Sequence, residues 1–355
     1  MGEVLTMWKT VEYKKGQINQ AGEKIILDKI TKEEKNECLK VINNWRVAHA
    51  FPMNTFTINL KKHVKEIDGA IVVQRLKRLD TIIDKLKRFP KMKLFRMQDL
   101  GGCRVILPTI DDVYRIKKKF QSSRIRHELH NEKDYIAIPN PNTGYRGIHL
   151  IYKYFSDRRD DFNGLQIEIQ LRSKKQHLWA TAVETVGVFT QNGLKFNQGS
   201  DRWLRFFKVV SALFSVDEKS AIVDGVSTDP NEIIDELIAL MRELKVTEKL
   251  FTIGLATRHI GRIQRSKTPG YYLLVLDISK STLHVSKFSG IEKATQEYDK
   301  AESEKTADMD VVLVSAESFD SLMHAYPNYF ANVTEFIDTL FELINKYGEF
   351  DENQL

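Results

Sequence analysis

The chain has 355 residues, of which 42% are hydrophobic and 29% are charged. This is ordinary globular composition, which excludes disordered and fibrous classes, and the length favours two domains over one. The net charge of +6 hides an asymmetry, because residues 1–215 carry 40 Lys and Arg against 23 Asp and Glu, whereas residues 216–355 carry 14 against 25. A basic half followed by an acidic half indicates a module that handles a polyanion and a second module that docks on it. Two solvated surfaces of unlike charge are the alternative interpretation.

The number of cysteines and the length of the apolar runs bear on the cellular location of the protein. Cys38 and Cys103 are too few for a disulfide framework or a zinc finger. The longest apolar runs, such as residues 271–276, are too short to cross a bilayer, and the N-terminus has no export-signal pattern. We therefore expect a cytoplasmic protein.

The first half of the chain predicts helices and then strands. Apolar spacing predicts helices over residues 17–50 and about 60–89, with Pro90 ending the second. Strands are expected at residues 103–107, 135–139, 147–154 and 165–171, and helices at about 109–120, capped by Thr109 or Asp111, and from about residue 175. This half is predicted to be an α+β domain, a mixed sheet with flanking helices.

The second half opens after a stretch rich in turn residues at 216–231. A helix is expected at 232–250, strands at 251–256, 271–278, 283–288 and 311–314, and closing helices at 318–330 and 334–346. The sequence thus predicts two domains, residues 1–225 and a smaller β-rich domain, residues 226–355.

A cationic run covers residues 75–93, which contain eight Lys and Arg residues and only two acidic residues, Asp80 and Asp84. Arg75, Arg78, Lys85 and Arg88 follow at intervals of three, seven and three residues, which predicts that several cations share one helix face. Clustered guanidinium and ammonium groups suit a triphosphate. A solvated helix face is the alternative.

Two acids accompany different predicted strands. Asp99 precedes the strand at 103–107, and Glu168 lies within the strand at 165–171, where polar Gln166, Glu168 and Gln170 alternate with aliphatic residues. Two carboxylates on neighbouring strands are typical of an Mg²⁺ site that holds nucleotide phosphates.

A loop rich in Pro and Gly carries an aromatic residue. Residues 133–149 read KDYIAIPNPNTGYRGIH, in which Tyr145 follows a glycine. An aromatic ring on a stiff loop is a stacking platform for a base, although a packed tyrosine in an ordinary hairpin fits as well.

Together, these motifs occur in one order: RLKR at residue 75, DLGGCRV at 99, DYIAIP at 134, GYRGIH at 144, EIQLR at 168 and LWATAVE at 178. In this order they resemble the synthetase domain of the RelA/SpoT homologue family, over residues 60–215. The resemblance implies a nucleotidyltransferase-like fold and pyrophosphoryl transfer, in which ATP donates its β,γ-diphosphate to a ribose hydroxyl and AMP leaves.

The resemblance also implies roles for individual residues. Asp99 and Glu168 are implied to be the catalytic acids and Mg²⁺ ligands, with Glu168 activating the attacking 3′-hydroxyl. Tyr145 is implied to stack on the acceptor base, with His149 in support. The residues implied to bind ATP are Arg75, Lys77, Arg78, Lys85, Arg104 and Arg172.

Two departures from the family pattern bear on the acceptor. The loop after Pro139 has no lysine for the acceptor's 5′-phosphates, and no hydrolase motif is found upstream. A small stand-alone synthetase is therefore expected, and toxin-type members of the family modify the 3′-CCA end of tRNA. A second basic segment is predicted to contact tRNA, and an amphipathic helix with a solvated basic face is the alternative interpretation. The cations of this segment are Arg115, Lys117, Lys118, Lys119, Arg124 and Arg126.

The acidic second half of the chain is expected to inhibit such an enzyme. Tyr326-Pro327-Asn328-Tyr329 resembles the YxxY element of fused toxin–antitoxin members of the CapRel type. In those proteins a C-terminal pseudo-zinc-finger domain blocks ATP entry until a phage protein, often a capsid component, binds it. The resemblance thus implies an autoinhibitory role for Tyr326 and Tyr329 in antiviral abortive infection. Packing of both tyrosines among the closing helices is the alternative.

Three other functions stay open at this point. The first is synthesis of (p)ppGpp or (p)ppApp from free nucleotides. The second is RNA binding without catalysis, which the intact Asp99 and Glu168 disfavour. In the third, the second half is an oligomerisation module.

Overall fold

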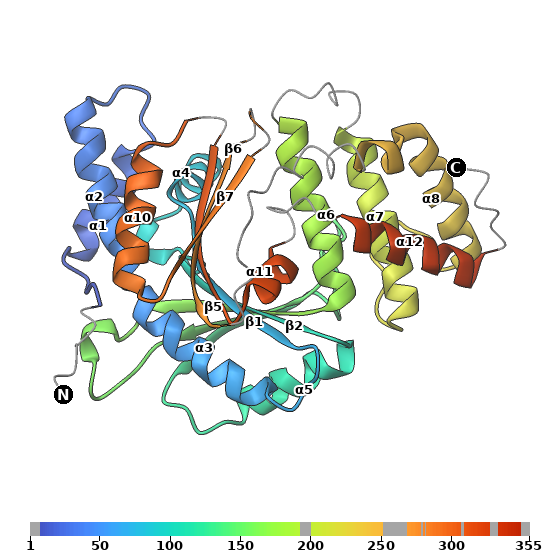
Figure 1. Ribbon diagram of the computed structural model, residues 1–355, viewed down its shortest axis with the longest axis horizontal. Helices are drawn as coiled ribbons and strands as arrows, with labels where there is room; N and C mark the ends of the chain where they lie inside the picture. The colour runs from blue at the N-terminus through green and yellow to red at the C-terminus, as the bar shows by residue number, and fades with distance from the viewer. Residues whose placement is uncertain are drawn as a thin grey trace.

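A mixed sheet of eight strands forms the centre of the computed structural model, with the order β3-β4-β5-β2-β1-β8-β6-β7 (Figure 1). The structure describes residues 8–191, 200–250, 268–277, 280, 282–306, 309–326 and 333–348. Within these residues, no helix is both long enough and apolar enough to cross a membrane.

The basic half supplies five of the eight strands. β1 (Ile71–Leu76) pairs antiparallel with β2 (Gly101–Leu107), which pairs parallel with β5 (Gln166–Ser173). β4 (Ile148–Lys153) pairs antiparallel with both β5 and the edge strand β3 (Glu128–Asp134). The predicted mixed sheet with flanking helices is confirmed.

Helices cover one face of this part of the sheet. α3 (Ala50–Val64) and α5 (Ile110–Gln121) lie together below it in Figure 1. The aliphatic residues of β5, Ile167 and Ile169, belong to the same buried core as Val113 and Phe120 of α5. Because side chains alternate along a strand, Gln166, Glu168 and Gln170 lie on the opposite face. The polar face of β5 is therefore the one left for a site.

Several predicted elements of the first half are wrong in detail. The helix expected over 60–89 is two helices, α3 and α4 (Leu79–Arg88), separated by β1, so Arg75 lies on a strand and shares no helix face with Lys85 and Arg88. The β-branched run Ile71-Val72-Val73 favours a strand. The helix expected over 17–50 is α1 (Lys15–Lys24) and α2 (Lys32–Ala48), the latter capped by Thr31.

The strand expected at 135–139 is a turn, and the strand lies just before it as β3. β3 reads ELHNEKD and is almost fully exposed, so an edge strand without an apolar run gave no signal in the sequence.

The C-terminal strands continue the same sheet. β6 (Gly270–Asp277) pairs antiparallel with β7 (Thr282–Phe288) and with β8 (Met309–Ala316), and β8 pairs with β1. α10 (Ile291–Ser303), which the sequence did not suggest, packs on β6 and β8. The strand expected at 251–256 lies outside the described residues.

The remaining C-terminal helices pack in two places. α11 (Phe319–Ala325) lies over β1 and β8, close to the middle of the molecule. α8 (Pro230–Leu244) and α12 (Thr334–Tyr347) form a bundle with α6 (Lys174–Gln191) and α7 (Ser200–Asp217), at one end of the molecule in Figure 1. The short 3₁₀ helices are η1 (Leu94–Arg96) and η2 (Asp160–Phe162). The segment after residue 225 thus packs on both the sheet and the helices of the first half.

Two neighbouring valines of β1 divide the core. Val72 is buried in the core that includes α3 and α5, whereas Val73 faces the other way. Val73 joins a separate cluster with residues of β6, β8 and α11, which we call the C-terminal cluster; its main members are Val73, Ile106, Tyr272, Leu274, Val312, Val314, Phe319, Leu322 and Tyr326.

This division predicts different effects for two similar substitutions. Val73→Ala should destabilise the C-terminal cluster by roughly 2 kcal/mol, through lost burial and an added cavity. Amide hydrogen exchange should then accelerate in β8 and α11 but not in α3. Val72→Ala should give the reverse pattern, and equal acceleration in both regions with either variant would contradict the division.

Candidate active site

A small polar cavity lies on the sheet face opposite α3 and α5. It has a volume of about 120 Å³ and is lined by Arg75, Lys77, Asp99, Gly102, Cys103, Arg104, Glu168, Gln170 and Tyr326. The strand register accounts for this grouping, because Gly102 of β2 pairs with Arg75 of β1 on one side and Glu168 of β5 on the other. Since Gly102 has no side chain, the floor between Arg75 and Glu168 stays open. We call this space the ATP-side cavity.

Two lysines hold Asp99 from one side. Its Oδ2 accepts hydrogen bonds from Lys77 Nζ and Lys85 Nζ, both at 2.9 Å. Burial raises the pKa of Asp99, but the two ammonium groups outweigh burial and bring the pKa below its ordinary value, so the group is a carboxylate at neutral pH. Its Oδ1 is buried and has no hydrogen-bond partner in the described structure.

The two predicted acids fit a magnesium ion. The carboxylate of Asp99 raises the pKa of Glu168 electrostatically, so the two groups lie within reach of each other, and both line the ATP-side cavity. A free carboxylate oxygen beside a second carboxylate is the donor set that Mg²⁺ takes together with substrate phosphates. The described residues contain no cluster of three or more His, Cys, Asp or Glu that would hold a metal without phosphates.

A buried hydrogen-bonded chain holds Glu168 from the other side. Glu168 Oε1 lies 3.0 Å from His149 Nδ1, and His149 Nε2 lies 2.6 Å from the hydroxyl oxygen of Tyr145. That oxygen also accepts hydrogen bonds from Arg172 Nε and Nη2, at 3.2 and 3.1 Å. Gln170 Nε2 donates to Glu168 Oε2 at 2.7 Å.

The charges in this chain shift its pKa values strongly. Burial lowers the pKa of His149, but Tyr145 and Glu168 outweigh burial and raise the pKa to about 9. Burial raises the pKa of Glu168, but the hydrogen bond and the charge of His149, together with the hydrogen bond from Gln170, outweigh burial and bring the pKa below its ordinary value. At neutral pH the site therefore contains an imidazolium beside a carboxylate, with the carboxylate able to accept a proton.

A second cavity, of about 180 Å³, shares Asp99 and Glu168 with the first. Its wall includes Arg96 and Lys133, two cations that the sequence did not suggest as site residues, and the ring of Tyr135. The predicted base-stacking residue, Tyr145, lies in edge contact with Tyr135 and His149 and does not line the cavity. We call this space the acceptor-side cavity. Tyr145 as the stacking residue stays a prediction, and Tyr135 is the aromatic ring that faces this cavity.

Of the six predicted ATP-binding cations, four line one of the two cavities and two do not. Arg75, Lys77 and Arg104 line the ATP-side cavity, and Lys85 lines the acceptor-side cavity. Arg78 forms an ion pair with Asp310 of β8. Arg172 is buried and holds Tyr145. The ATP-binding role of all six stays a prediction.

The basic segment at 115–126 lies apart from these cavities. α5, which carries four of its cations, covers the sheet face opposite Glu168. Arg115 pairs with Asp112 at 2.5 Å and Lys117 with Glu132 at 2.5 Å, and Arg126 pairs with Asp157. Contact of this segment with tRNA stays a prediction, but the predicted contact lies away from the reacting groups.

Tyr326 of the predicted inhibitory motif lies in the ATP-side cavity. Its side chain is buried, with 2% of the residue exposed, and the Arg104 guanidinium lies 5.5 Å from its ring centre. Arg104 Nη1 also donates to the carbonyl oxygen of Ala325 at 3.1 Å. Tyr329 lies outside the described residues.

The raised pKa of His149 predicts a pH-dependent stability. A histidine whose folded pKa is above its unfolded value stabilises the fold fully below pH 6.5, and the stabilisation is lost as pH rises through about 9. We expect the free energy of unfolding to fall by roughly 2–3 kcal/mol over this window. Urea unfolding at half-unit pH intervals measures it.

His149→Gln is the control for this prediction, because glutamine cannot titrate. The variant should show a markedly flatter profile between pH 6.5 and 9. A fall in stability that is equally steep in the variant would assign the titration to another group.

Comparisons with known proteins bear on this site. Residues 74–189, about a third of the chain, match the family described as "Region found in RelA / SpoT proteins". The chain is 30% identical over 112 residues to the GTP pyrophosphokinase YjbM of Bacillus subtilis, which covers 31% of this chain and 52% of that protein. It is also 30% identical over 115 residues to the GTP pyrophosphokinase YwaC of the same organism, covering 30% and 52%. The chain therefore spans about half the length of these curated relatives.

Among solved structures, small alarmone synthetase 1 from Bacillus subtilis bound to its product pppGpp aligns with a TM-score of 0.44 and 20% identity, covering 50% of this chain and 92% of that one. The matched family region contains Asp99, Glu168 and the chain from Glu168 to Tyr145. Residues 74–189 are therefore similar to the region found in RelA/SpoT proteins, and the two curated relatives that share 30% identity with the chain are named GTP pyrophosphokinases.

Proposed function

We propose that the chain is an ATP- and Mg²⁺-dependent pyrophosphokinase that its own C-terminal segment holds inactive. The observation that carries the proposal is the ATP-side cavity, in which a cation cluster and two carboxylates meet and into which Tyr326 inserts. The homology over residues 74–189 to GTP pyrophosphokinases supports the reaction class.

The proposed reaction uses the geometry as follows. The acceptor 3′-hydroxyl oxygen forms a bond to the β-phosphorus of ATP, the bond from this phosphorus to the α,β-bridging oxygen breaks, and AMP leaves. The hydroxyl proton passes to the Glu168 carboxylate, which His149 holds at 3.0 Å. Arg75, Lys77 and Arg104 stabilise the phosphate charge, which is most of what such a transfer requires. Asp99 and Glu168 would hold Mg²⁺, which when bound neutralises further phosphate charge.

The size of the cavity supports the proposed restraint. Pockets for ligands of nucleotide size measure about 300–1,000 Å³. With Tyr326 in place the ATP-side cavity measures only about 120 Å³, so a nucleoside triphosphate has no room. The C-terminal segment must therefore move before ATP binds.

Further contacts fix the segment in this position. Asp310 pairs with Arg78, and Lys305 pairs with Asp80. His177 Nε2 lies 2.8 Å from the carbonyl oxygen of His324, next to the inserted tyrosine. Asp310 thus pairs with Arg78, and the carbonyl group of Ala325 and the ring of Tyr326 contact Arg104, so two of the predicted ATP-binding cations have partners in the C-terminal segment.

The first candidate acceptor is the 3′-hydroxyl of the tRNA CCA end, modification of which would block translation. This candidate rests on the resemblance to toxin-type members and on the missing lysine after Pro139. Free nucleotides, giving (p)ppGpp or (p)ppApp, are the second candidate. Lys133 and Arg96 favour the second, because they bring cations to the acceptor-side cavity that 5′-phosphates can use.

Release of the restraint is proposed to follow from a phage protein, such as a capsid component, that binds the C-terminal segment. This trigger, and with it a role in abortive infection, rests on the resemblance to fused toxin–antitoxin members. The C-terminal segment supplies three strands and α10, a large surface on which such a partner would act.

Transfer of label from γ-³²P-ATP tests the proposal. Tyr326→Ala should raise the transfer rate at least tenfold over the unaltered chain, because the substitution removes the ring that fills the cavity. Bulk tRNA, GDP and GTP are offered in parallel, and the labelled product identifies the acceptor.

Two further variants keep this experiment decisive. Glu168→Gln combined with Tyr326→Ala should abolish transfer, and Tyr347→Ala, in α12 and away from the cavity, should leave the basal rate unchanged. A folded Tyr326→Ala variant with an unaltered rate would refute the restraint. Absence of label from every variant and acceptor would refute the enzymatic function.

A further inference from the structure

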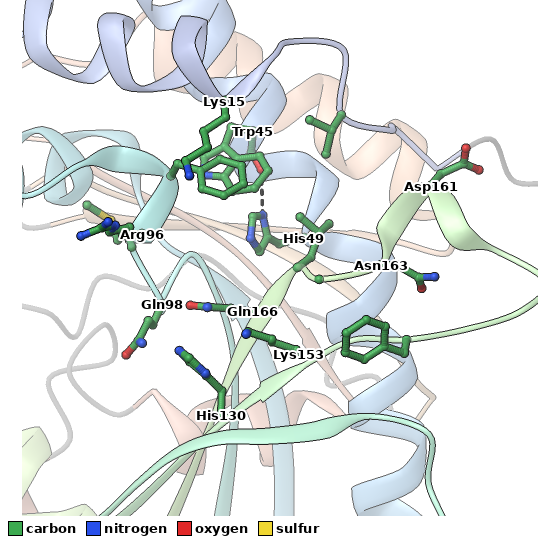
Figure 2. Close-up of a pocket in the computed structure, with 16 residues that line it drawn as sticks. Lys15, Trp45, His49, Arg96, Gln98, His130, Lys153, Asp161, Asn163 and Gln166 are labelled. Carbon is green, nitrogen blue, oxygen red and sulfur yellow. Dashed lines mark hydrogen bonds between the residues drawn. The ribbon is translucent and has the colours of Figure 1, made fainter.

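A third and larger cavity lies beside the acceptor-side cavity. It has a volume of about 690 Å³, within the range of small-ligand pockets. Figure 2 shows Trp45 and Lys15 on one side of it, with Gln98, His130, Lys153 and Gln166 on the other. Its wall shares Arg96, Met97 and Gln98 with the acceptor-side cavity, so the two spaces adjoin.

The charge of this cavity suits an anion. Lys15 of α1, Arg96 of η1 and Lys153 of β4 line it, against one acid, Asp161. Within the described chain none of these three cations forms an ion pair; Lys15 lies over the Phe95 ring, 5.3 Å from its centre. Cations gathered around a cavity without acidic partners are available to phosphate groups.

Two buried polar atoms of lining residues also lack partners. The indole Nε1–H of Trp45, a residue only 4% exposed, and Oε1 of Gln166 have no hydrogen-bond partner in the described structure. An unmet buried donor or acceptor costs about 1–3 kcal/mol, so a ligand that draws either atom into the cavity by a turn of its side chain would recover part of this cost. A nucleobase edge offers an acceptor and a donor side by side. The half-buried rings of Phe95 and Phe155 line the same cavity and offer apolar surface to a base.

The polar face of β5 links the three cavities in a row. Gln166 lines the large cavity, Glu168 lines both the acceptor-side and ATP-side cavities, and Gln170 lines the ATP-side cavity. Alternate residues of a strand lie about 7 Å apart, so one short step separates the reacting carboxylate from the large cavity. The room beyond the acceptor-side cavity exceeds what a diphosphate needs.

We propose that the large cavity is a subsite for the nucleotide that precedes the reacting 3′ end of a single-stranded RNA acceptor. The inference rests on the proposed function for the direction of the acceptor, with its 3′-hydroxyl at Glu168. Lys15 and Lys153 contact the phosphates, and Trp45 and Gln166 contact the base. Among the described residues, all those that line the cavity come before residue 170, so no described part of the C-terminal segment lines it.

Direct binding tests this subsite on the full-length chain. The probe is a fluorescent pentaribonucleotide that ends in CCA with a free 3′-hydroxyl, titrated without ATP at several salt concentrations. Lys15→Ala with Lys153→Ala should weaken binding at least tenfold and lower the slope of log affinity against log salt by about 1.4, since each phosphate contact on a single strand contributes about 0.7. Trp45→Phe keeps an aromatic ring without the N–H and should weaken binding about three- to tenfold.

Lys62→Ala is the matched control, because Lys62 lies on α3, on the opposite face of the sheet, and is exposed. It should change oligonucleotide binding less than twofold. GDP binding, measured by competition, should also stay within twofold in the variants of the cavity. Thermal midpoints close to that of the unaltered chain confirm that each variant is folded.

Three results would overturn the proposal. The first is a loss no larger than that of Lys62→Ala, and the second is no oligonucleotide binding by the unaltered chain. The third is an equal loss for GDP, which would assign the cavity to the 5′-phosphates of a free nucleotide. Because the titration contains no ATP, its outcome does not depend on any transfer reaction, and this separates the inference from the proposed function.

Discussion

The arrangement of this molecule depends on a cation cluster that three adjacent strands hold around two carboxylates. Arg75, Lys77 and Arg104 face the same cavity, but only Asp99 and Glu168 lie there to balance them. Partly buried cations of this kind cost free energy unless an anion or a polar group meets them. In the proposed reaction a triphosphate and a metal ion would meet them. In the structure the C-terminal segment meets Arg104 instead, through the carbonyl group of Ala325 and the ring of Tyr326, and Asp310 pairs with the nearby cation Arg78.

The proposed restraint is built on the edge of the sheet. Without β8, β1 would be an edge strand, and it carries Arg75 at the cavity. Only Gln74 and Arg75 of β1 pair with β8, whereas β8 pairs with β6 over eight residues. The C-terminal strands are therefore held firmly to one another and less firmly to the synthetase region, apart from the packing of Val73 and Ile106 in the C-terminal cluster. Such an arrangement allows the three strands and α11 to separate from the site as a unit, with the sheet of the synthetase region intact.

The sequence predicted the parts of this site that depend on local motifs. Asp99, Glu168 and the cations from Arg75 to Arg104 come together because β1, β2 and β5 are neighbours in the sheet. The sequence misplaced β1 within a helix, because the charged residues that follow it continue a helical pattern. It missed Lys133, since β3 is a polar edge strand, and it missed Trp45 because nothing local connects α2 to a site more than a hundred residues away along the chain. Contacts of this kind depend on the tertiary fold.

The same reasoning explains why the acceptor side of the proposed enzyme is harder to predict from the sequence than the donor side. The cations of the ATP-side cavity belong to ordered motifs, whereas the walls of the acceptor-side and large cavities come in part from α1, α2, η1, β3 and β4, each of which contributes between one and three residues. A synthetase that takes a free nucleotide needs little beyond the acceptor-side cavity. This chain has a further 690 Å³ beside it, with three cations that lack acidic partners and a buried indole N–H without an acceptor among the described residues. Because unmet buried polar atoms cost stability, a fold that keeps them beside a basic cavity, one step along β5 from Glu168, is better explained by a longer acceptor than by packing.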